Sequence, residues 1–249
     1  MASVETTIGI SCDVTAVDVP RLNVQLTYID FVAAGGAVPI VLPPHASALE
    51  ALHLCDGVLF VGADDYRCGN RNGEPAGFTA VHPRRESTDI ELARAVLDRD
   101  IPCLSVCGGF QLMALVAGGS IFGDLDTEAP PSAVRHKRER PEQPLVRHSV
   151  TWSYDDKLPG VAAGDHEINS HHHQAVSVLP PDWRSVGVAP DGIVEAALGP
   201  GRFQLGAQWH PEREPESAIN DGLLRAFLGA AGTYRQSRIV DPTRRKIRQ

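Results

Sequence analysis

Cys107 is the residue that most clearly suggests chemistry, because an apolar segment precedes it and Gly108 and Gly109 follow it. A strand that turns sharply into a helix lifts one side chain above the carboxyl edge of a sheet, where the next backbone N–H groups face it. The positive end of the helix dipole there favours the nucleophilic thiolate. For a lone cysteine, a small buried structural residue that ends a core strand is the better interpretation, so a second motif has to decide.

The second motif is His210-Pro211-Glu212, at the end of an expected late strand over residues 202–209. A cysteine nucleophile needs a base that takes its proton and returns it to the leaving amine, and that base needs an acidic partner that fixes its tautomer. Two residues apart in extended chain, His210 and Glu212 project to the same side. The sequence therefore predicts a catalytic triad of Cys107, His210 and Glu212.

The elements that must position these residues alternate between strand and helix. This order predicts an α/β fold with a doubly wound, mostly parallel sheet flanked by helices. The expected strands are Thr7 to Cys12, Val38 to Leu42, Gly57 to Val61 and Ile101 to Val106, and the expected helices are Arg21 to Ala34, Ser47 to Leu54 and Ser87 to Arg99, the last one capped by Ser87.

Length and charge limit the function classes. The chain has 249 residues and a formal net charge of −8, so a nucleic-acid partner is not expected. The sequence has neither a long apolar segment nor a signal peptide, which predicts a cytoplasmic protein without a membrane partner. Five cysteines without a Cys-x-x-Cys pair argue against a disulfide framework or a zinc ribbon.

One domain is expected over residues 1–232, followed by a basic C-terminal tail over residues 233–249. The proline-rich stretch from Asp124 to Arg147, which contains the run Arg135 to Arg138, is interpreted as a solvated surface excursion. The segment from Arg67 to Arg85 is expected to be an exposed loop.

The run His171-His172-His173 raises the question of a metal site. Consecutive residues of an extended strand point to opposite faces, and no nearby carboxylate or cysteine spacing completes a ligand set, so no metal is predicted. A pocket role for His172, supported by His173 or Gln174, is preferred. The other histidines have no strong spacing relation, and most are interpreted as surface or satisfied structural groups; they are His45, His53, His82, His136, His148 and His166.

Three motifs together resemble a known family. Cys107, Gly109 and Gln111 match a Cys-x-Gly-x-Gln nucleophile motif, residues 209–212 match a His-x-Glu motif, and residues 169–176 match an Asn-Ser-x-His-His-Gln stretch. The chain resembles the class I glutamine amidotransferases, which have a flavodoxin-like fold. Within them it is similar to the gamma-glutamyl hydrolase branch, peptidase group C26, which includes gamma-glutamyl-gamma-aminobutyrate hydrolases. The resemblance runs in order from Thr7 to Glu212.

This resemblance implies an oxyanion hole made by the backbone N–H groups of Gly62 and Gly108. It also implies that Gln111 helps line the glutamyl pocket, to which His172, His173 and Gln174 are expected to contribute. The expected chemistry needs no metal or organic cofactor. Two positions depart from the family pattern, because Val61 replaces a glycine beside Gly62 and Gly108 replaces an arginine after the nucleophile. The second departure bears on which substrate is accepted.

The expected function is cysteine-dependent hydrolysis of gamma-glutamyl amide bonds, of the gamma-glutamyl-amine or gamma-glutamyl-gamma-aminobutyrate type, through a gamma-glutamyl thioester. A first alternative is a glutaminase subunit that supplies ammonia to a synthetase partner. A second alternative is a catalytically silent binding module of the same fold. The sequence leaves the amine side of the small-molecule substrate open, and it leaves a homodimer open as well.

Overall fold

The computed structural model describes residues 5–15, 19–67, 77–138, 140 and 142–240. Its centre is a nine-stranded sheet in the order β4-β1-β5-β6-β13-β12-β11-β8-β9. The bounds of these strands, in sheet order, are Val38–Leu42, Thr7–Ser11, Gly57–Phe60, Cys103–Val106, Gln204–Ala207, Val194–Leu198, Arg184–Val188, Val146–Trp152 and Gly164–Ser170. The first five strands are parallel, and the other four continue the sheet in antiparallel pairs.

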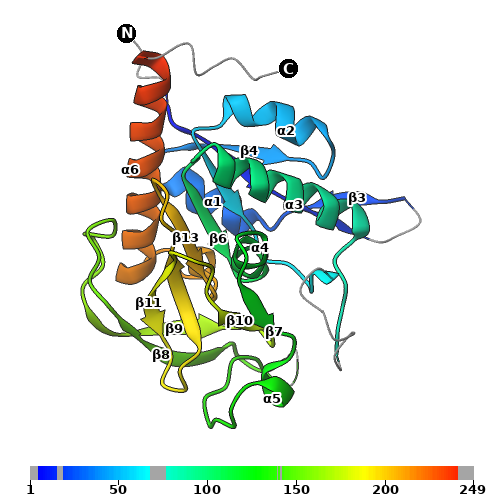
Figure 1. The fold of residues 1–249 in the computed structure, drawn as a ribbon, viewed down its shortest axis with the longest axis vertical. Coiled ribbons are helices and arrows are strands. Elements are labelled where there is room, and N and C mark those ends of the chain that lie inside the picture. The colour runs from blue at the N-terminus through cyan, green and yellow to red at the C-terminus, as the bar shows by residue number, and fades with distance from the viewer. Residues whose placement is uncertain (1–4, 16–18, 68–76, 139, 141, 241–249) are drawn as a thin grey trace.

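Helices cover both faces of the parallel half (Figure 1). One buried apolar cluster joins the sheet to α1 (Leu26–Ala34) and α6 (Ala218–Val240). A second cluster joins it to α2 (Ser47–Ala51), α3 (Pro83–Asp98) and α4 (Gly108–Val116). The predicted α/β fold, with a sheet flanked by helices, is therefore confirmed. Strand β6 lies inside the sheet and is buried along its whole length, as expected for a strand covered on both faces.

The smaller elements lie around this frame. Their bounds are β2 (Asp13–Thr15), β3 (Arg21–Asn23), η1 (Leu52–Leu54), β7 (Ser120–Phe122), α5 (Leu125–Glu128), β10 (Ala175–Val178) and η3 (Pro211–Arg213). Strands β2 and β3 form one two-stranded sheet, and β7 and β10 form another. No helix among the described residues is long and apolar enough to cross a membrane.

Two predicted helices have different boundaries in the structure. The helix expected from Arg21 begins only at Leu26, because Arg21–Asn23 pairs with β2, a tertiary contact that helical spacing does not reveal. Helix α3 begins at Pro83, earlier than the expected Ser87. His82 caps it by accepting a hydrogen bond from the N–H of Arg84, and proline is favourable in the first turn of a helix.

The boundary expected at residue 232 falls inside a helix. Helix α6 continues to Val240, and Arg238 donates a hydrogen bond of 2.7 Å to the carbonyl of Cys55. The tail predicted over residues 233–249 therefore begins as an ordered, docked helix, and residues 241–249 lie outside the described residues.

The expectation of a solvated excursion between Asp124 and Arg147 is wrong for two of its residues. Asp124 and His136 are buried, with 5% and 7% of their surface exposed. His136 is buried because its ring nitrogens face the side chains of Asp191 and Glu195, which lie far from it in the sequence.

Candidate active site

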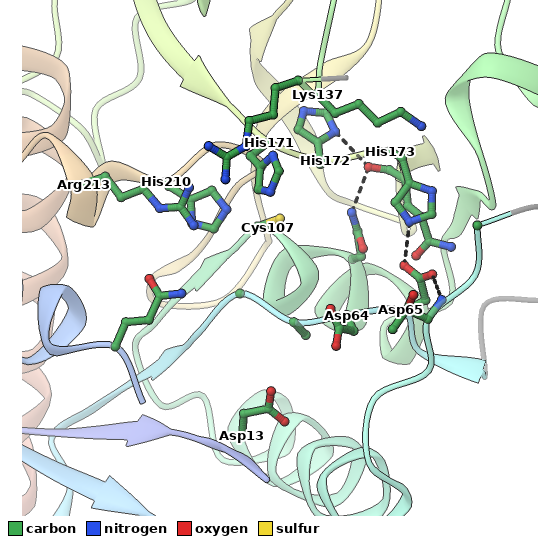
Figure 2. A pocket seen from close by; sticks show the side chains of 18 of the residues that line it. Asp13, Asp64, Asp65, Cys107, Lys137, His171, His172, His173, His210 and Arg213 are labelled. Carbon is green, nitrogen blue, oxygen red and sulfur yellow. Dashed lines mark hydrogen bonds and ion pairs between the residues drawn. The ribbon is translucent and has the colours of Figure 1, made fainter. Parts of the chain in front are cut away.

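Cys107 and His210 follow two neighbouring parallel strands. Val106 at the end of β6 pairs with Ala207 at the end of β13, and the N–H of Cys107 donates to the carbonyl of Ala207 at 2.8 Å. His210 follows three residues later. The sheet therefore brings a nucleophile candidate and a base candidate, about a hundred residues apart in the sequence, to the same carboxyl edge (Figure 2).

The backbone of Cys107 is strained, with φ 51° and ψ −114°, in a region that side-chain-bearing residues rarely occupy. Helix α4 begins directly after it, and the N–H groups of Phe110 and Gln111 donate to the Cys107 carbonyl. The N–H groups of Gly108 and Gly109 precede these bonds and belong to the unpaired first turn of the helix. This is the sharp strand-to-helix turn that the sequence predicts.

Glycine is required after Cys107 because the neighbouring backbone lies so close. A Cβ atom on Gly108 would lie 2.7 Å from the Cβ and 2.8 Å from the nitrogen of Ala63, and one on Gly109 would lie 2.6 Å from the carbonyl oxygen of Phe60. The loop after β5 therefore lies directly against the start of α4. An arginine side chain at position 108 would displace this loop, which gives a physical reason for the departure from the family pattern.

His210 and Glu212 form a buried pair. The Nδ1 atom of His210 lies 2.8 Å from Oε1 of Glu212, whose side chain is fully buried. Because an ionised carboxylate only accepts, Nδ1 carries the proton and Nε2 is left for proton transfer. Burial lowers the pKa of His210, but Cys107 and Glu212 outweigh it and raise the pKa to about 9.

Asn169 holds the backbone of His210 on both sides. Its Oδ1 atom accepts from the N–H of His210 at 3.1 Å, and its Nδ2 atom donates to the carbonyl of His210 at 2.9 Å. Asn169 belongs to the Asn-Ser-x-His-His-Gln stretch, but the sequence analysis gave it no role. The structure makes it the link between that stretch and the imidazole.

Gly62, one of the predicted oxyanion donors, lies beside both Cys107 and His210. A Cβ atom on Gly62 would lie 3.0 Å from Cε1 of His210 and 3.7 Å from Cβ of Cys107. Its N–H group donates to the hydroxyl of Tyr28 at 2.9 Å, and that hydroxyl lies 3.4 Å from Nδ1 of His210. Tyr28 was not among the predicted site residues, because its place in α1 gives no local signal.

The loop that carries Gly62 is held from behind by Arg85. The Nη2 atom of this buried arginine donates to the carbonyl oxygens of Gly62 at 2.9 Å and Val61 at 3.3 Å. Its Nε atom forms an ion pair of 3.0 Å with Asp89, one helical turn further along α3. Arg85 and Asp89, which the sequence analysis also missed, therefore fix the loop that supplies the predicted oxyanion donor.

A cavity of about 460 Å³ opens over Cys107 and His210. The four predicted substrate-binding residues, Gln111, His172, His173 and Gln174, all line it. All four side chains also have partners within the protein, and His172 Nδ1 lies 2.9 Å from the carbonyl oxygen of Gln174. Gln111 donates to the carbonyl of Gln174, Gln174 donates to that of Gly123, and His173 faces Asp65 at 3.0 Å. The Nε2 atom of His172 points away from the cavity, toward the buried carboxylate of Glu195.

Opposite charges line this cavity. Asp13, Asp64 and Asp65 lie on one side of Cys107, and Lys137 and Arg213 lie on the other (Figure 2). The pKa of Asp64 is raised by burial and by the two neighbouring aspartates. The pKa of His171 is lowered to about 4, by burial and by the nearby cationic side chains of Arg213 and Arg138. The cavity therefore offers anionic, cationic and neutral imidazole groups to a ligand.

The catalytic candidates do not form a metal centre. Among the described residues, one group of side chains brings three or more ligand atoms together, within 4.8 Å of one another, and it consists of His136, His148, His172 and Glu195. The prediction that no metal is bound rests on the spacing inside the run of three histidines and on the lack of a carboxylate or cysteine near it in the sequence. The structure adds a carboxylate from a distant strand, which that spacing does not reveal.

Known proteins are similar to this chain over most of its length. The sequence profile of the peptidase C26 family matches residues 6–212. This chain belongs to the peptidase C26 family. Gamma-glutamyl-gamma-aminobutyrate hydrolase PuuD of Escherichia coli is 31% identical over 222 residues, which cover 84% of this chain and 86% of PuuD. Protein NtpR of Enterococcus hirae is 28% identical over 221 residues, or 82% and 90% of the two chains.

Two solved structures share the fold of this C26 family member. A glutamine amidotransferase from Thermotoga maritima has a TM-score of 0.59 at 13% identity, over 97% of this chain and 88% of its own. A glutamine amidotransferase from Methylobacillus flagellatus has a TM-score of 0.57 at 14% identity, over 94% and 95% of the two chains. The predicted family resemblance is confirmed, and it places the chain among hydrolases of the gamma-glutamyl hydrolase and amidotransferase-like class.

Proposed function

We propose that this protein hydrolyses gamma-glutamyl amide bonds with Cys107 as nucleophile, His210 as acid and base, and Glu212 as the group that orients His210. The observation that carries the proposal is the strained turn that presents Cys107 beside an imidazole whose far nitrogen is bonded to a buried carboxylate. This arrangement supplies the three groups that a cysteine hydrolase needs.

In the first half of the reaction, the Cys107 thiolate attacks the gamma-carbonyl carbon of the substrate. The carbon–nitrogen bond then breaks, His210 gives a proton to the departing amine, and a gamma-glutamyl thioester remains. In the second half, His210 takes a proton from water, which attacks the thioester. Glutamate leaves and the thiolate is restored, so the atoms balance without a cofactor.

The negative oxygen formed in each half needs fixed donors. The N–H of Gly108, in the unpaired first turn of α4, and the N–H of Gly62 are the proposed donors. In the structure the Gly62 N–H bonds to Tyr28, so substrate would take the place of the Tyr28 hydroxyl. Loss of one such donor typically slows a reaction by about 10²- to 10³-fold.

The charges of the cavity support a glutamyl substrate. The free end of a gamma-glutamyl group carries an ammonium and a carboxylate on one carbon. Asp64 and Asp65 offer anionic partners for the first, and Arg213 and Lys137 offer cationic partners for the second. We propose that Gln111, His172, His173 and Gln174 shape the wall between these two groups.

A glutamine-site affinity reagent tests the mechanism directly. A diazoketone analogue of glutamine, followed by peptide mass mapping, is expected to label Cys107. Cys12, Cys55 and Cys103 serve as internal controls, because each is at most 1% exposed and burial raises the pKa of each thiol, to about 12 for Cys103. Label on one of these three, or on Cys68, which lies outside the described residues, with Cys107 untouched would refute the mechanism.

A second candidate function is a glutaminase subunit that passes ammonia to a synthetase partner, which the amidotransferase folds of the two structural neighbours favour. Glutamate release should be measured from gamma-glutamyl amines, gamma-glutamyl-gamma-aminobutyrate and glutamine with the protein alone. Cleavage of the amines by the isolated protein supports the hydrolase. Activity restricted to glutamine and dependent on an added synthetase would reverse the ranking, and no turnover together with no labelling would indicate a silent binding module.

A further inference from the structure

A second constellation of chemical groups lies behind the wall of the cavity. His136 comes from the segment before β8, His148 from β8, His172 from the segment after β9, and Glu195 from β12. We call these four residues the His–Glu cluster. Their side chains are 6%, 6%, 1% and 0% exposed in that order. The proposed hydrolysis uses neither His136, His148 nor Glu195, so the cluster needs an explanation of its own.

The outward nitrogen of each ring fixes its tautomer. The Nδ1 atoms of His148 and His172 lie 3.1 and 2.9 Å from the carbonyl oxygens of Ser149 and Gln174. Because a carbonyl oxygen can only accept, both of these nitrogens carry a proton. The Nε2 atom of His136 likewise lies 2.9 Å from the carboxylate of Asp191. A neutral ring in this orientation turns a lone pair, and not an N–H group, toward the inside of the cluster.

These lone pairs meet a carboxylate. His136 Nδ1, His148 Nε2 and His172 Nε2 lie 3.2, 3.4 and 3.4 Å from the same oxygen, Oε1 of Glu195. Within the described part of the chain, none of the three inward nitrogens and neither oxygen of Glu195 has a hydrogen-bond partner. Four electron-rich atoms that converge in a buried space repel one another unless a cation lies between them.

The donor groups identify the class of cation. Zinc in a structural site is tetrahedral, with bonds of about 2.0–2.1 Å to histidine nitrogen, so neighbouring ligand atoms lie about 3.3–3.4 Å apart. The three nitrogen–oxygen distances of 3.2, 3.4 and 3.4 Å agree with this value. The four ligand atoms lie within 4.8 Å of one another, so the imidazole nitrogens would move closer together around a bound ion. Three imidazoles suit zinc or a related transition metal, whereas Mg²⁺ and Ca²⁺ prefer oxygen ligands.

We propose that His136, His148, His172 and Glu195 bind one zinc-class divalent ion in a closed tetrahedral site. The outward hydrogen bonds then act as supports that orient each ring, with Asp191 completing a carboxylate–histidine–metal arrangement. A neighbouring cavity of about 390 Å³, lined by His136, His172 and Asp191, gives the ion a path from solvent.

The proposed ion has a structural role. All four ligands come from the protein, which leaves no open position for a substrate or a water molecule. His172 lies in the middle of the segment 171–174, whose residues line the active-site cavity. Bound metal would fix this wall by tying it to β8 and β12. The inference stands apart from the proposed hydrolysis, because the ion takes no part in it.

Metal analysis of the full-length protein, purified with its affinity tag removed, tests the proposal. The wild-type protein is expected to hold about one equivalent of zinc-class metal after dialysis. Protein stripped with a chelator and reloaded with Co²⁺ is expected to show the intense visible absorption of a tetrahedral site. Added Zn²⁺ should raise the melting temperature of the stripped protein, a readout that needs no enzymatic activity.

Variants locate the site. Asp191→Asn keeps the shape of the residue but weakens the support of His136, so zinc affinity should fall by about 10- to 100-fold. Glu195→Gln and His148→Ala should lose the metal and the Co²⁺ spectrum. His166→Ala is the matched control, because His166 lies on β9 but bonds to the carbonyl of Ala162, outside the cluster. It should keep full affinity.

Two results would overturn the proposal. One is wild-type protein that neither contains metal nor responds to Zn²⁺ or Co²⁺, which would mean that protons and not a metal hold the cluster together. The other is bound metal that Glu195→Gln and His148→Ala leave in place with unchanged affinity. Cys107→Ala separates this inference from the proposed function, because it should abolish hydrolysis and leave the metal content unchanged.

Discussion

The active site and the His–Glu cluster both pair histidine with a buried carboxylate, yet the two arrangements differ in where the protons lie. At the active site one ring, His210, directs its protonated nitrogen at Glu212 at 2.8 Å. In the cluster three rings direct their protonated nitrogens away from Glu195 and their lone pairs toward it. The first arrangement leaves one imidazole nitrogen free for proton transfer. The second leaves a set of ligands, so the same residue types serve different chemistry.

Replacing the nucleophile should have the largest effect on activity, and it should leave the metal content of the His–Glu cluster unchanged. Cys107→Ala is expected to lower kcat by about 10⁶-fold, because no other group can form the thioester. Steady-state glutamate release measures this loss, and the melting temperature should stay close to that of the wild type. Turnover near the wild-type level in this variant would contradict the assigned nucleophile.

Matched changes of the two carboxylates compare the regions directly. Glu212→Gln should lower kcat by about 10⁴-fold, because an amide does not hold the tautomer of His210 that catalysis needs. KM and metal content should change little. Glu195→Gln should show the reverse, with metal lost and Cys107 still open to labelling. Equal loss of activity and of metal in both variants would show that the two regions are one functional unit.

Replacing Asn169 should lower the rate less than replacing Glu212. Asn169 lies in β9, directly before the segment that carries His172 of the His–Glu cluster. Asn169→Ala removes both hydrogen bonds to the backbone of His210, so the imidazole is less well placed. A displacement of this kind costs about 10²-fold in rate. The loss should lie in kcat, with KM nearly constant, because Asn169 acts through His210. Asn169→Asp keeps one acceptor and should recover part of the rate, which a purely structural role would not predict.

The smallest expected effect is a pH dependence of stability that originates at the active site. The pKa of His210 is about 9 in the folded protein, above its usual value of about 6.5. Its stabilising contribution is therefore complete below about pH 6.5 and is lost as pH rises through about 9. Chemical denaturation should show wild-type protein losing about 1–3 kcal/mol more than Cys107→Ala over this range. Identical slopes for the two proteins would contradict the coupling between Cys107 and His210.

Local patterns were sufficient for the strand-to-helix turn and for the central strands. The segment 101–106 is nearly all apolar, and two glycines follow Cys107, so sequence alone predicts a buried strand and a tight turn. The strand expected over Val38 to Leu42 has the same bounds in the structure. These features depend on neighbours in the chain, which is why composition and spacing reveal them.

Contacts between distant segments could not be predicted in this way. Tyr28 reaches Gly62 from α1, and Arg85 reaches the same loop from α3, without any local motif that marks them. The ligand candidates of the His–Glu cluster are spread over sixty residues, and His136 lies in a basic run that is typical of solvated surface. Their burial depends on the antiparallel half of the sheet, whose pairing the sequence analysis did not derive.

The extended C-terminal helix links the end of the chain to its beginning. Asp56 accepts a hydrogen bond of 3.0 Å from the N–H of Thr7, where β1 starts, and forms ion pairs of 3.8 Å with Arg235 and 3.6 Å with Arg238. The ribosome therefore releases the first strand of the sheet long before the residues that secure it. Complete docking of β1 has to wait for helix α6, and a truncation at residue 232 would remove both arginines that pair with Asp56.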